Sequence, residues 1–214
     1  MTQEWLALGD NRARVLAAAH DALNHELAAL NLLGSRLTLQ VENAFPLLFG
    51  CGGRVVITGI GKPGRVGEKI AATLSSTGTP SFFIHSGEAL HGDSGALAAG
   101  DVVIAISNSG TTTEVCAFVE FAIRMGVPVI AMVGNVDSAL ARLATAVLDM
   151  SVAREADPLN LAPTASTTVA MVMGDVLACA LMTARNFSAA DFTRSHPAGA
   201  LGARNDEKLD QESK

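Results

Sequence analysis

The chain has 214 residues, of which 49% are apolar and 17% charged, so it is long and apolar enough to fold around one sizeable core. Its formal net charge is −6, and aromatic residues make up only 4%, without any tyrosine. This balance excludes a generic nucleic-acid or acidic-membrane surface and argues against surfaces on which bases stack.

Cysteine usage points to a reducing compartment. The three cysteines, Cys51, Cys116 and Cys179, are odd in number and far apart, so they form neither a disulfide framework nor a metal-finger pattern. The first residues lack the basic and apolar regions of a signal peptide, and apolar runs are interrupted before they reach the length of a membrane span. We therefore expect a cytoplasmic protein that binds no membrane and no nucleic acid.

The first predicted element is a helical arm over residues 12–49. A break is expected near Gly34, and Pro46 and Gly50 mark the end. The arm carries no candidate chemistry, so we interpret it as a packing or oligomerisation element. Its leucines recur at spacings of 7, 4 and 3, which places them on one face: Leu16, Leu23, Leu27 and Leu30.

From residue 54 onward, short apolar runs alternate with helical patterns. Strands that are apolar throughout are typical of a parallel sheet covered by helices on both faces. The sequence therefore predicts an α/β domain with a doubly wound, five-stranded parallel sheet, in which ligands bind at the carboxyl ends of the strands. The predicted strands span 54–59, 80–85, 101–107, 127–134 and 146–152, and the main helices 64–77, 111–126, 137–145 and 163–185.

The clearest candidate site is the segment SNSGTTTE, from Ser107 to Glu114, between a strand and a helix. Its hydroxyl groups surround Gly110, which lets the backbone approach a ligand, and the following helix N-terminus favours an anion. A structural alternative is helix capping, since Thr111 and Glu114 have the spacing of a capping box. Capping does not account for four hydroxyls, so the pattern favours a phosphate site. The hydroxyls belong to Ser107, Ser109, Thr111 and Thr112.

A second glycine-rich turn, GIGKPG from Gly59 to Gly64, follows the first predicted strand. The glycine spacing matches the dinucleotide fingerprint, but the next strand ends in His85 instead of an acidic residue, so a nicotinamide cofactor is disfavoured. Lys62 is placed to meet a phosphate or sugar oxygen, or it is a solvated loop lysine. The loop from His85 to Gly95 holds two histidines and two carboxylates at no recognised metal spacing, which disfavours a required metal.

Two further residues are candidates for proton transfer. Glu155 follows the fifth predicted strand and precedes a helix N-terminus, where a carboxylate is well placed as a general base. Its alternative is a salt bridge with Arg154. His196 follows a short helix that begins at Ser188 with Asp191 completing a capping box, and histidine moves protons near neutral pH. The alternative for His196 is an ordinary C-terminal turn.

Taken together, these segments resemble the sugar isomerase (SIS) domain of arabinose 5-phosphate isomerases over about residues 15–203. The segments that carry the resemblance are GIGK at 59–62, STGTPSFFIHSGEALHGDSG at 76–95, DVVIAISNSGTTTE at 101–114, EADPLNLAPTASTT at 155–168 and SHPAGALG at 195–202. We accordingly expect a single SIS domain over residues 1–203, and a polar tail over 204–214 without fixed structure.

The resemblance implies an aldose–ketose isomerase that interconverts D-arabinose 5-phosphate and D-ribulose 5-phosphate and feeds synthesis of the octulosonate sugar Kdo, used in lipopolysaccharide and some capsules. It implies a flavodoxin-like fold, no cofactor, a phosphosugar as the small-molecule partner, and a homotetramer with active sites at subunit interfaces. The catalytic residues that it implies are Lys62, Glu114, Glu155 and His196. The substrate-binding residues that it implies are Gly61, Gly78, Thr79, His85, His91, Ser107, Asn108, Ser109, Thr112, Thr164 and Ser166.

Several details of this interpretation stay open. Glu155 is interpreted as the carbon base and His196 as the group that moves protons between O1 and O2, or the two roles are exchanged. Lys62 would neutralise the enediolate, and Glu114 would assist proton transfer or cap its helix and orient Lys62. No metal is required, although His85 matches a family position that can bind an inhibitory zinc ion. His91 is interpreted as substrate-facing or as a structural histidine.

The chain departs from the family at two points. Pro63 stands where serine is common, which removes a hydroxyl and a backbone N–H from the phosphate region. The usual pair of CBS domains is absent after GALG, so we expect no control through them. The alternatives are a sugar-phosphate-sensing domain and an isomerase of another phosphosugar, such as a heptose phosphate. The acid–base set argues against the sensor, because binding alone does not need it.

Overall fold

The computed structural model describes residue 9 and residues 11–196. Its centre is a five-stranded parallel sheet in the order β2-β1-β3-β4-β5. The strands are β1 (Val55–Gly59), β2 (Ser81–His85), β3 (Val102–Ser107), β4 (Val129–Val133) and β5 (Ala146–Asp149). The sheet confirms the predicted fold class, and each predicted strand lies within three residues of the observed one at either end.

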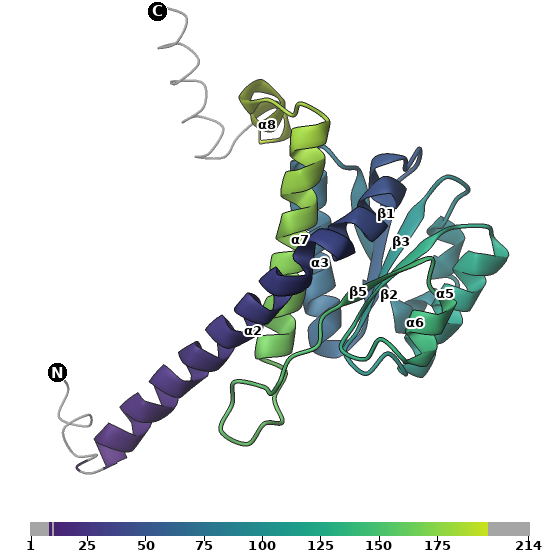
Figure 1. The fold of residues 1–214 in the computed structure, drawn as a ribbon. Coiled ribbons are helices and arrows are strands. Elements are labelled where there is room, and N and C mark those ends of the chain that lie inside the picture. Colours follow the sequence, from purple (N-terminus) through teal and green to yellow (C-terminus); the bar gives the residue numbers. More distant parts are fainter. Residues whose placement is uncertain (1–8, 10, 197–214) are drawn as a thin grey trace, which may run out of the picture.

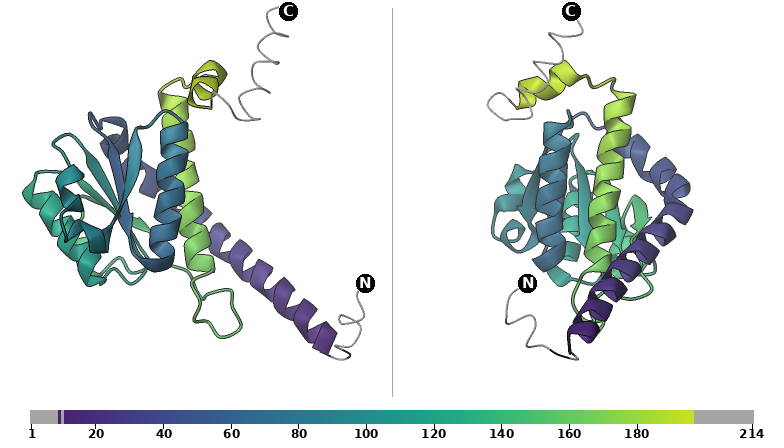
Figure 2. Two further views of the ribbon diagram at one scale, coloured as in Figure 1. Left: turned by 180° about the vertical axis from the view of Figure 1, so that it is seen from behind. Right: turned by 90° about the vertical axis from the view of Figure 1, so that its left-hand side faces the viewer.

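Helices cover both faces of this sheet (Figures 1 and 2). One face carries α2 (Asn11–Phe49), α3 (Gly61–Ser76) and α7 (Ala165–Ala184), and the other carries α4 (Ser86–Ala89), α5 (Thr113–Arg124) and α6 (Ala139–Leu143). A short 3-10 helix, η1 (Asp93–Ala96), precedes β3, and α8 (Ala189–Ser195) follows α7. Every residue of β1, β3 and β4 is buried, which explains why these strands are apolar throughout.

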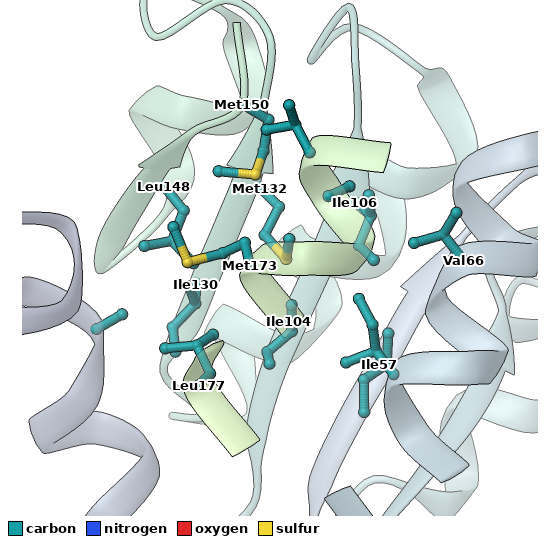
Figure 3. Close-up of a cluster of buried hydrophobic side chains, with 14 of the residues drawn as sticks. Ile57, Val66, Ile104, Ile106, Ile130, Met132, Leu148, Met150, Met173 and Leu177 are labelled. Atoms are coloured by element: carbon teal, nitrogen blue, oxygen red, sulfur yellow. The ribbon is translucent and has the colours of Figure 1, made fainter. Parts of the chain in front are cut away.

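The larger part of the core lies between the sheet and α7. Ile57, Ile104 and Ile130 point from neighbouring strands toward Met173 and Leu177 of α7 (Figure 3). By its length and composition α7 is apolar enough to cross a membrane, and it is the only such helix among the described residues. Here it packs against α2 and α3 and serves as the central helix of this layer.

The N-terminal helix α2 differs from its prediction in two respects. It is continuous through Gly34 and runs past Pro46 to Phe49, so the predicted break is wrong. A mid-helix glycine costs only about 1 kcal/mol, and the burial of Leu33 and Ala44 offsets that cost.

The first half of α2 projects away from the body of the domain (Figures 1 and 2). Its first buried residue is Ala29, and Leu16, Leu23 and Leu27 before it are exposed. Most of the stability of a helix in a protein comes from packing of its apolar face, which this half of α2 lacks within one chain. The exposed leucines fit the predicted oligomerisation role, which stays a prediction.

The strand register aligns the carboxyl ends of the sheet at one edge. Gly59 is level with His85 and Ile106, and Val133 is level with Ser107 and Asp149. The chain continues from β1 to β2 on one side and returns to β3 on the other, so the topological switch point lies between β1 and β3. The turns after β1 and β3, which contain the two predicted glycine-rich segments, therefore lie side by side.

Candidate functional site

The turn after β3 is a compact loop held by its own hydroxyl groups. The Ser107 hydroxyl lies 2.9 Å from that of Thr112 and accepts the Gly110 N–H at 3.1 Å. The Ser109 hydroxyl accepts both the N–H and the hydroxyl of Thr111, at 3.3 and 3.1 Å. Gly110 has φ +64°, and a Cβ there would clash with the Ser138 hydroxyl, so the turn admits only glycine.

Helix α5 begins with backbone N–H groups that no side chain caps. Its N-cap is Thr112, whose hydroxyl pairs with Ser107 instead of the helix. The structural alternative of a capping box between Thr111 and Glu114 is therefore wrong, and Glu114 is exposed in the first turn of α5. Free N–H groups at a helix N-terminus, together with the helix dipole, attract an anion. Because no side chain caps these N–H groups, they are free to bind a phosphate group, which strengthens the interpretation of this turn as a phosphate site.

Helix α3 presents a second N-terminus at the same edge. It begins at Gly61, three residues before the predicted start, and no side chain caps it. Lys62 is exposed in its first turn. Pro63 lies in that turn as well, where a missing N–H breaks no intrahelical hydrogen bond. A Cβ on Gly64 would lie 3.0 Å from the Gly59 carbonyl oxygen, so this glycine pair serves close strand–helix packing.

The Glu155 carboxylate occupies the N-terminus of α7. It accepts the Thr164 N–H at 2.9 Å, the Thr164 hydroxyl at 3.2 Å and the Ser166 N–H at 3.1 Å, and the Ser166 hydroxyl bonds to its other oxygen. The alternative of a salt bridge with Arg154 is wrong, because Arg154 donates to the backbone carbonyl of Glu155 at 3.1 Å.

These hydrogen bonds offset the effect of burial on the charge of Glu155. Burial raises the pKa of its carboxyl group, but the bonds from Ser166 and Thr164 lower it by more, so the pKa lies below its ordinary value. The carboxylate is therefore ionised at neutral pH, which is the state that a general base needs.

A small cavity joins these parts at the carboxyl edge of the sheet. Asn108 from the turn after β3 and Ser166 from α7 both line it, and Pro63 from α3 closes a third side. Lys62 precedes Pro63 in the chain, and the Glu155 carboxylate bonds to Ser166, so each is next to a residue that lines this cavity. Met132 and Met150 also line it. Sequence reasoning missed these two methionines, because they look like any other apolar residue of a buried strand. The only signal that could have indicated them is their position near the carboxyl end of a predicted strand.

His85, which ends β2, and His91, which follows it, do not line this cavity. His85 lines a neighbouring one with Gly61, and its Nδ1 accepts the Gly87 N–H at 3.2 Å, which leaves Nε2 for a ligand. His91 is exposed in the following turn. Across residues 11–196 no group of three or more His, Cys, Asp or Glu side chains could hold a metal ion.

Three predicted site residues lie at the opposite edge of the sheet. Thr79 is buried before β2 and bonds to Arg185, and a Cβ on its neighbour Gly78 would contact Phe187. His196 stacks on the Phe192 ring with centroids 4.0 Å apart. Residues after His196, including the rest of the SHPAGALG segment and the expected tail, lie outside the described residues.

Helix α7 separates the two groups. Glu155 caps its start, whereas α8 and His196 follow its end, at the far side of the domain (Figure 1). Its 20 residues span about 30 Å. One chain therefore places Lys62 and Glu155 next to residues that line one cavity, whereas His196 lies beyond the other end of α7.

Sequence reasoning also missed the residues that shape the segment around Glu155. The Asp157 carboxylate accepts the N–H groups of Leu159, Leu161 and Ala162 at 2.8–2.9 Å, and these bonds lower its pKa despite the opposing effect of desolvation. The Asn160 side chain accepts the Glu155 N–H at 2.6 Å. Pro158 and Pro163 indicated an irregular loop, but no sequence signal indicated these pairings.

The SIS domain family model matches residues 47–180. The arabinose 5-phosphate isomerase KdsD of Pseudomonas aeruginosa is 52% identical over 187 residues, which cover 87% of this chain and 57% of that protein. The arabinose 5-phosphate isomerase GutQ of Salmonella typhimurium is 49% identical over 190 residues, which cover 89% and 59%. The chain thus spans less than two thirds of these relatives. Among solved structures, the E. coli CFT073 protein c3406 in complex with arabinose 5-phosphate matches with a TM-score of 0.83 at 40% identity, covering 86% of this chain and 98% of that one.

Proposed function

Because the chain belongs to the SIS domain family, we propose that it is an aldose–ketose isomerase that interconverts D-arabinose 5-phosphate and D-ribulose 5-phosphate. The observation that carries this proposal is the cavity where Asn108 and Ser166 meet, because it joins an anion-binding turn to the ionised Glu155. The names of the relatives that are about half identical to the chain support the same reaction.

The turn after β3 and the start of α5 anchor the phosphate group. Asn108 and Ser109 are exposed there, and uncapped N–H groups of α5 and α3 point to the same edge of the sheet. Neutral donors of this kind bind a dianion without a large positive surface, which agrees with the net charge of −6. An anchored phosphate fixes the far end of the sugar and so positions the reacting carbons.

The reaction moves one proton between carbons and one between oxygens. Glu155 takes the C2 proton of the open-chain aldose, and the resulting enediolate receives that proton at C1. The O2 proton moves to O1 in the same sequence, which is the role of His196. Lys62 stabilises the negative charge of the enediolate. The substrate itself balances the hydrogens, so the reaction needs no redox cofactor.

The roles proposed for Glu155 and His196 require more than one copy of the chain. Glu155 and His196 lie at opposite ends of α7, so they serve one substrate only when a second copy supplies His196. The split supports an oligomer with its active sites at subunit interfaces, as do the exposed leucines of the α2 arm, and the family resemblance makes that oligomer a homotetramer. Gly78 and Thr79 lie against Phe187 and Arg185 at the same end of α7 as His196, so any contact of theirs with the substrate would come from that second copy.

The proposal also places the reaction in the cytoplasm, as a step toward Kdo. Cys51, Cys116 and Cys179 are unpaired, as expected in a reducing compartment.

A coupled assay for ribulose 5-phosphate, with arabinose 5-phosphate as substrate and a chelator present, tests the reaction. We expect turnover in the wild type and a loss of about three orders of magnitude in Glu155→Gln, because the amide cannot take a proton. Glu120→Gln, at an exposed glutamate of α5, serves as the matched control and should retain full activity.

Two outcomes would replace the proposal. A wild type that binds the sugar phosphate without turning it over would indicate a sensor domain. Faster turnover of a hexose or heptose phosphate in a substrate panel would indicate an isomerase of another phosphosugar.

A further inference from the structure

The segment over residues 155–164, here called the Glu155 loop, is closed by hydrogen bonds within itself. Pro158 and Pro163 have no N–H, and seven of the eight remaining backbone N–H groups are bonded inside the loop. The donors are those of Glu155, Ala156, Leu159, Asn160, Leu161, Ala162 and Thr164. A rearrangement of the loop would break several of these hydrogen bonds at once, which is unfavourable. It therefore behaves as a fixed projection and not as a mobile lid.

Two leucines stand on this projection. Leu159 is 74% exposed and Leu161 is 77% exposed, which makes them the most exposed large apolar side chains in the described part of the chain. A loop that could bend would turn such side chains toward its own domain. Because the Glu155 loop is closed by its own hydrogen bonds, the leucines stay directed outward, as on a contact surface.

The base of the loop adjoins a second exposed apolar region. Ala153 and Arg154, just before the loop, form a cavity with His25 and Leu32 of α2. Leu32 is 41% exposed and lies on α2, whose first half projects from the domain (Figures 1 and 2). The base of the Glu155 loop is thus next to the helix that the sequence assigns to assembly.

We propose that Leu159 and Leu161 dock onto a second copy of this chain, and that this is the copy whose His196 completes the site at Glu155. The inference rests on the proposed function, since that function requires the two residues to act on one substrate. The copy that supplies His196 must then lie next to Glu155. Leu159 is four residues further on, within about 14 Å even for an extended chain, so it lies within reach of the same copy.

Docking of this rigid loop would link assembly to catalysis. The same hydrogen bonds that fix the leucines also fix the Glu155 backbone N–H and its carboxylate. Seating the loop on the second copy therefore sets the position of the carboxylate relative to the incoming His196.

The test is the double variant Leu159→Ser/Leu161→Ser, with sedimentation and activity measured over a range of protein concentrations. Both side chains are exposed, so we expect a wild-type circular dichroism spectrum, with a melting temperature lowered only through the weaker assembly. Loss of the contact should raise the dissociation constant of the assembly on the order of a hundredfold. Specific activity should then fall on dilution and recover at high protein concentration, by mass action. Ile123→Ser, at an exposed residue of α5 on the other face of the sheet, is the matched control and should change neither readout.

Each other outcome has a distinct meaning. A variant with wild-type sedimentation and activity that is independent of concentration would overturn the docking. So would a fully assembled variant that is inactive at every concentration, since the leucines would then act only within their own chain. If the wild type assembles through these leucines but turns over no sugar phosphate, the proposed function fails while the contact stands.

Discussion

Glu155 shows how one side chain acquires two tasks. Its carboxylate satisfies N–H groups at the start of α7 that would otherwise lack partners, as an N-cap does. The same bonds lower the pKa of the group and fix its position beside the cavity. A capping carboxylate is therefore also a preorganised base, although each bond that it accepts reduces its basicity.

Removing one of these bonds should shift the pH dependence of the reaction. In Ser166→Ala the carboxylate loses the hydrogen bond from the Ser166 hydroxyl, so we expect the pKa of Glu155 to rise. A base works only when deprotonated, so the acid limb of the pH profile of kcat/KM should move to higher pH. Thr167→Ala is the matched control, because its hydroxyl bonds to the carbonyl groups of Pro163 and Thr164 instead. Equal profiles for the two variants would contradict this account of Glu155.

The same shift affects stability in a defined direction. The pKa of Glu155 is lower in the folded chain than its ordinary value, so its hydrogen bonds contribute stability above that ordinary value. The contribution is lost as the pH falls through the folded-state pKa. Ser166→Ala should therefore reduce stability at neutral pH and show a weaker additional loss on acidification, as urea unfolding at a series of pH values would measure.

At the scale of elements, two glycines inside helices have opposite functions. Gly174 in α7 faces Ile70 of α3, and a Cβ at Gly174 would overlap the Ile70 side chain, so this glycine allows the two helices to approach closely. A Cβ at Gly34 in α2 would meet nothing within 4 Å. The sequence shows only a glycine in each helix, and packing decides what each one does.

Alanine substitutions should separate these functions. Gly34→Ala should stabilise the chain by about 0.5–1 kcal/mol through helix propensity. Gly174→Ala gains the same propensity but forces overpacking, so we expect a net loss of about 1–2 kcal/mol. Urea unfolding of both variants measures the difference, and adding Ile70→Val to Gly174→Ala should recover part of the loss. Stabilisation by both substitutions would show that the α3–α7 contact is looser than described.

At the scale of the whole molecule, the candidate site is divided between the two ends of α7. Lys62 and Glu155 lie at the carboxyl edge of the sheet, and His196 lies at the other edge. The division explains why an enzyme of this kind would be inactive as a single chain.

Complementation between inactive variants tests the division directly. Glu155→Gln and His196→Gln chains should each be inactive, and coexpression with two different tags should restore activity. Random pairing gives an intact site in about one quarter of cases, so we expect about a quarter of wild-type activity in the mixed assembly. Mixed assemblies as inactive as their parents would indicate that each site is built within one chain.

The sequence by itself determined the parts of the fold that depend on local pattern. Buried parallel strands are apolar throughout, so β1, β3 and β4 could be located to within a few residues. The SNSG turn and its following helix were identified because strand, glycine and hydroxyl residues are adjacent in the chain. Glu155 was found in the same way, from its place between a strand and a helix.

Only the tertiary structure decided what depends on residues far apart in the sequence. Helix α2 continues through Gly34 because packing against the sheet outweighs the local preference. The hydrogen-bond partners of Glu155 depend on a loop that folds back on itself, and no periodic pattern in the sequence predicts the course of that loop. The separation of Glu155 from His196 follows from the direction and length of α7 once it is packed on the sheet. A motif fixes the chemistry of a residue, but the path of the chain fixes which residues can meet.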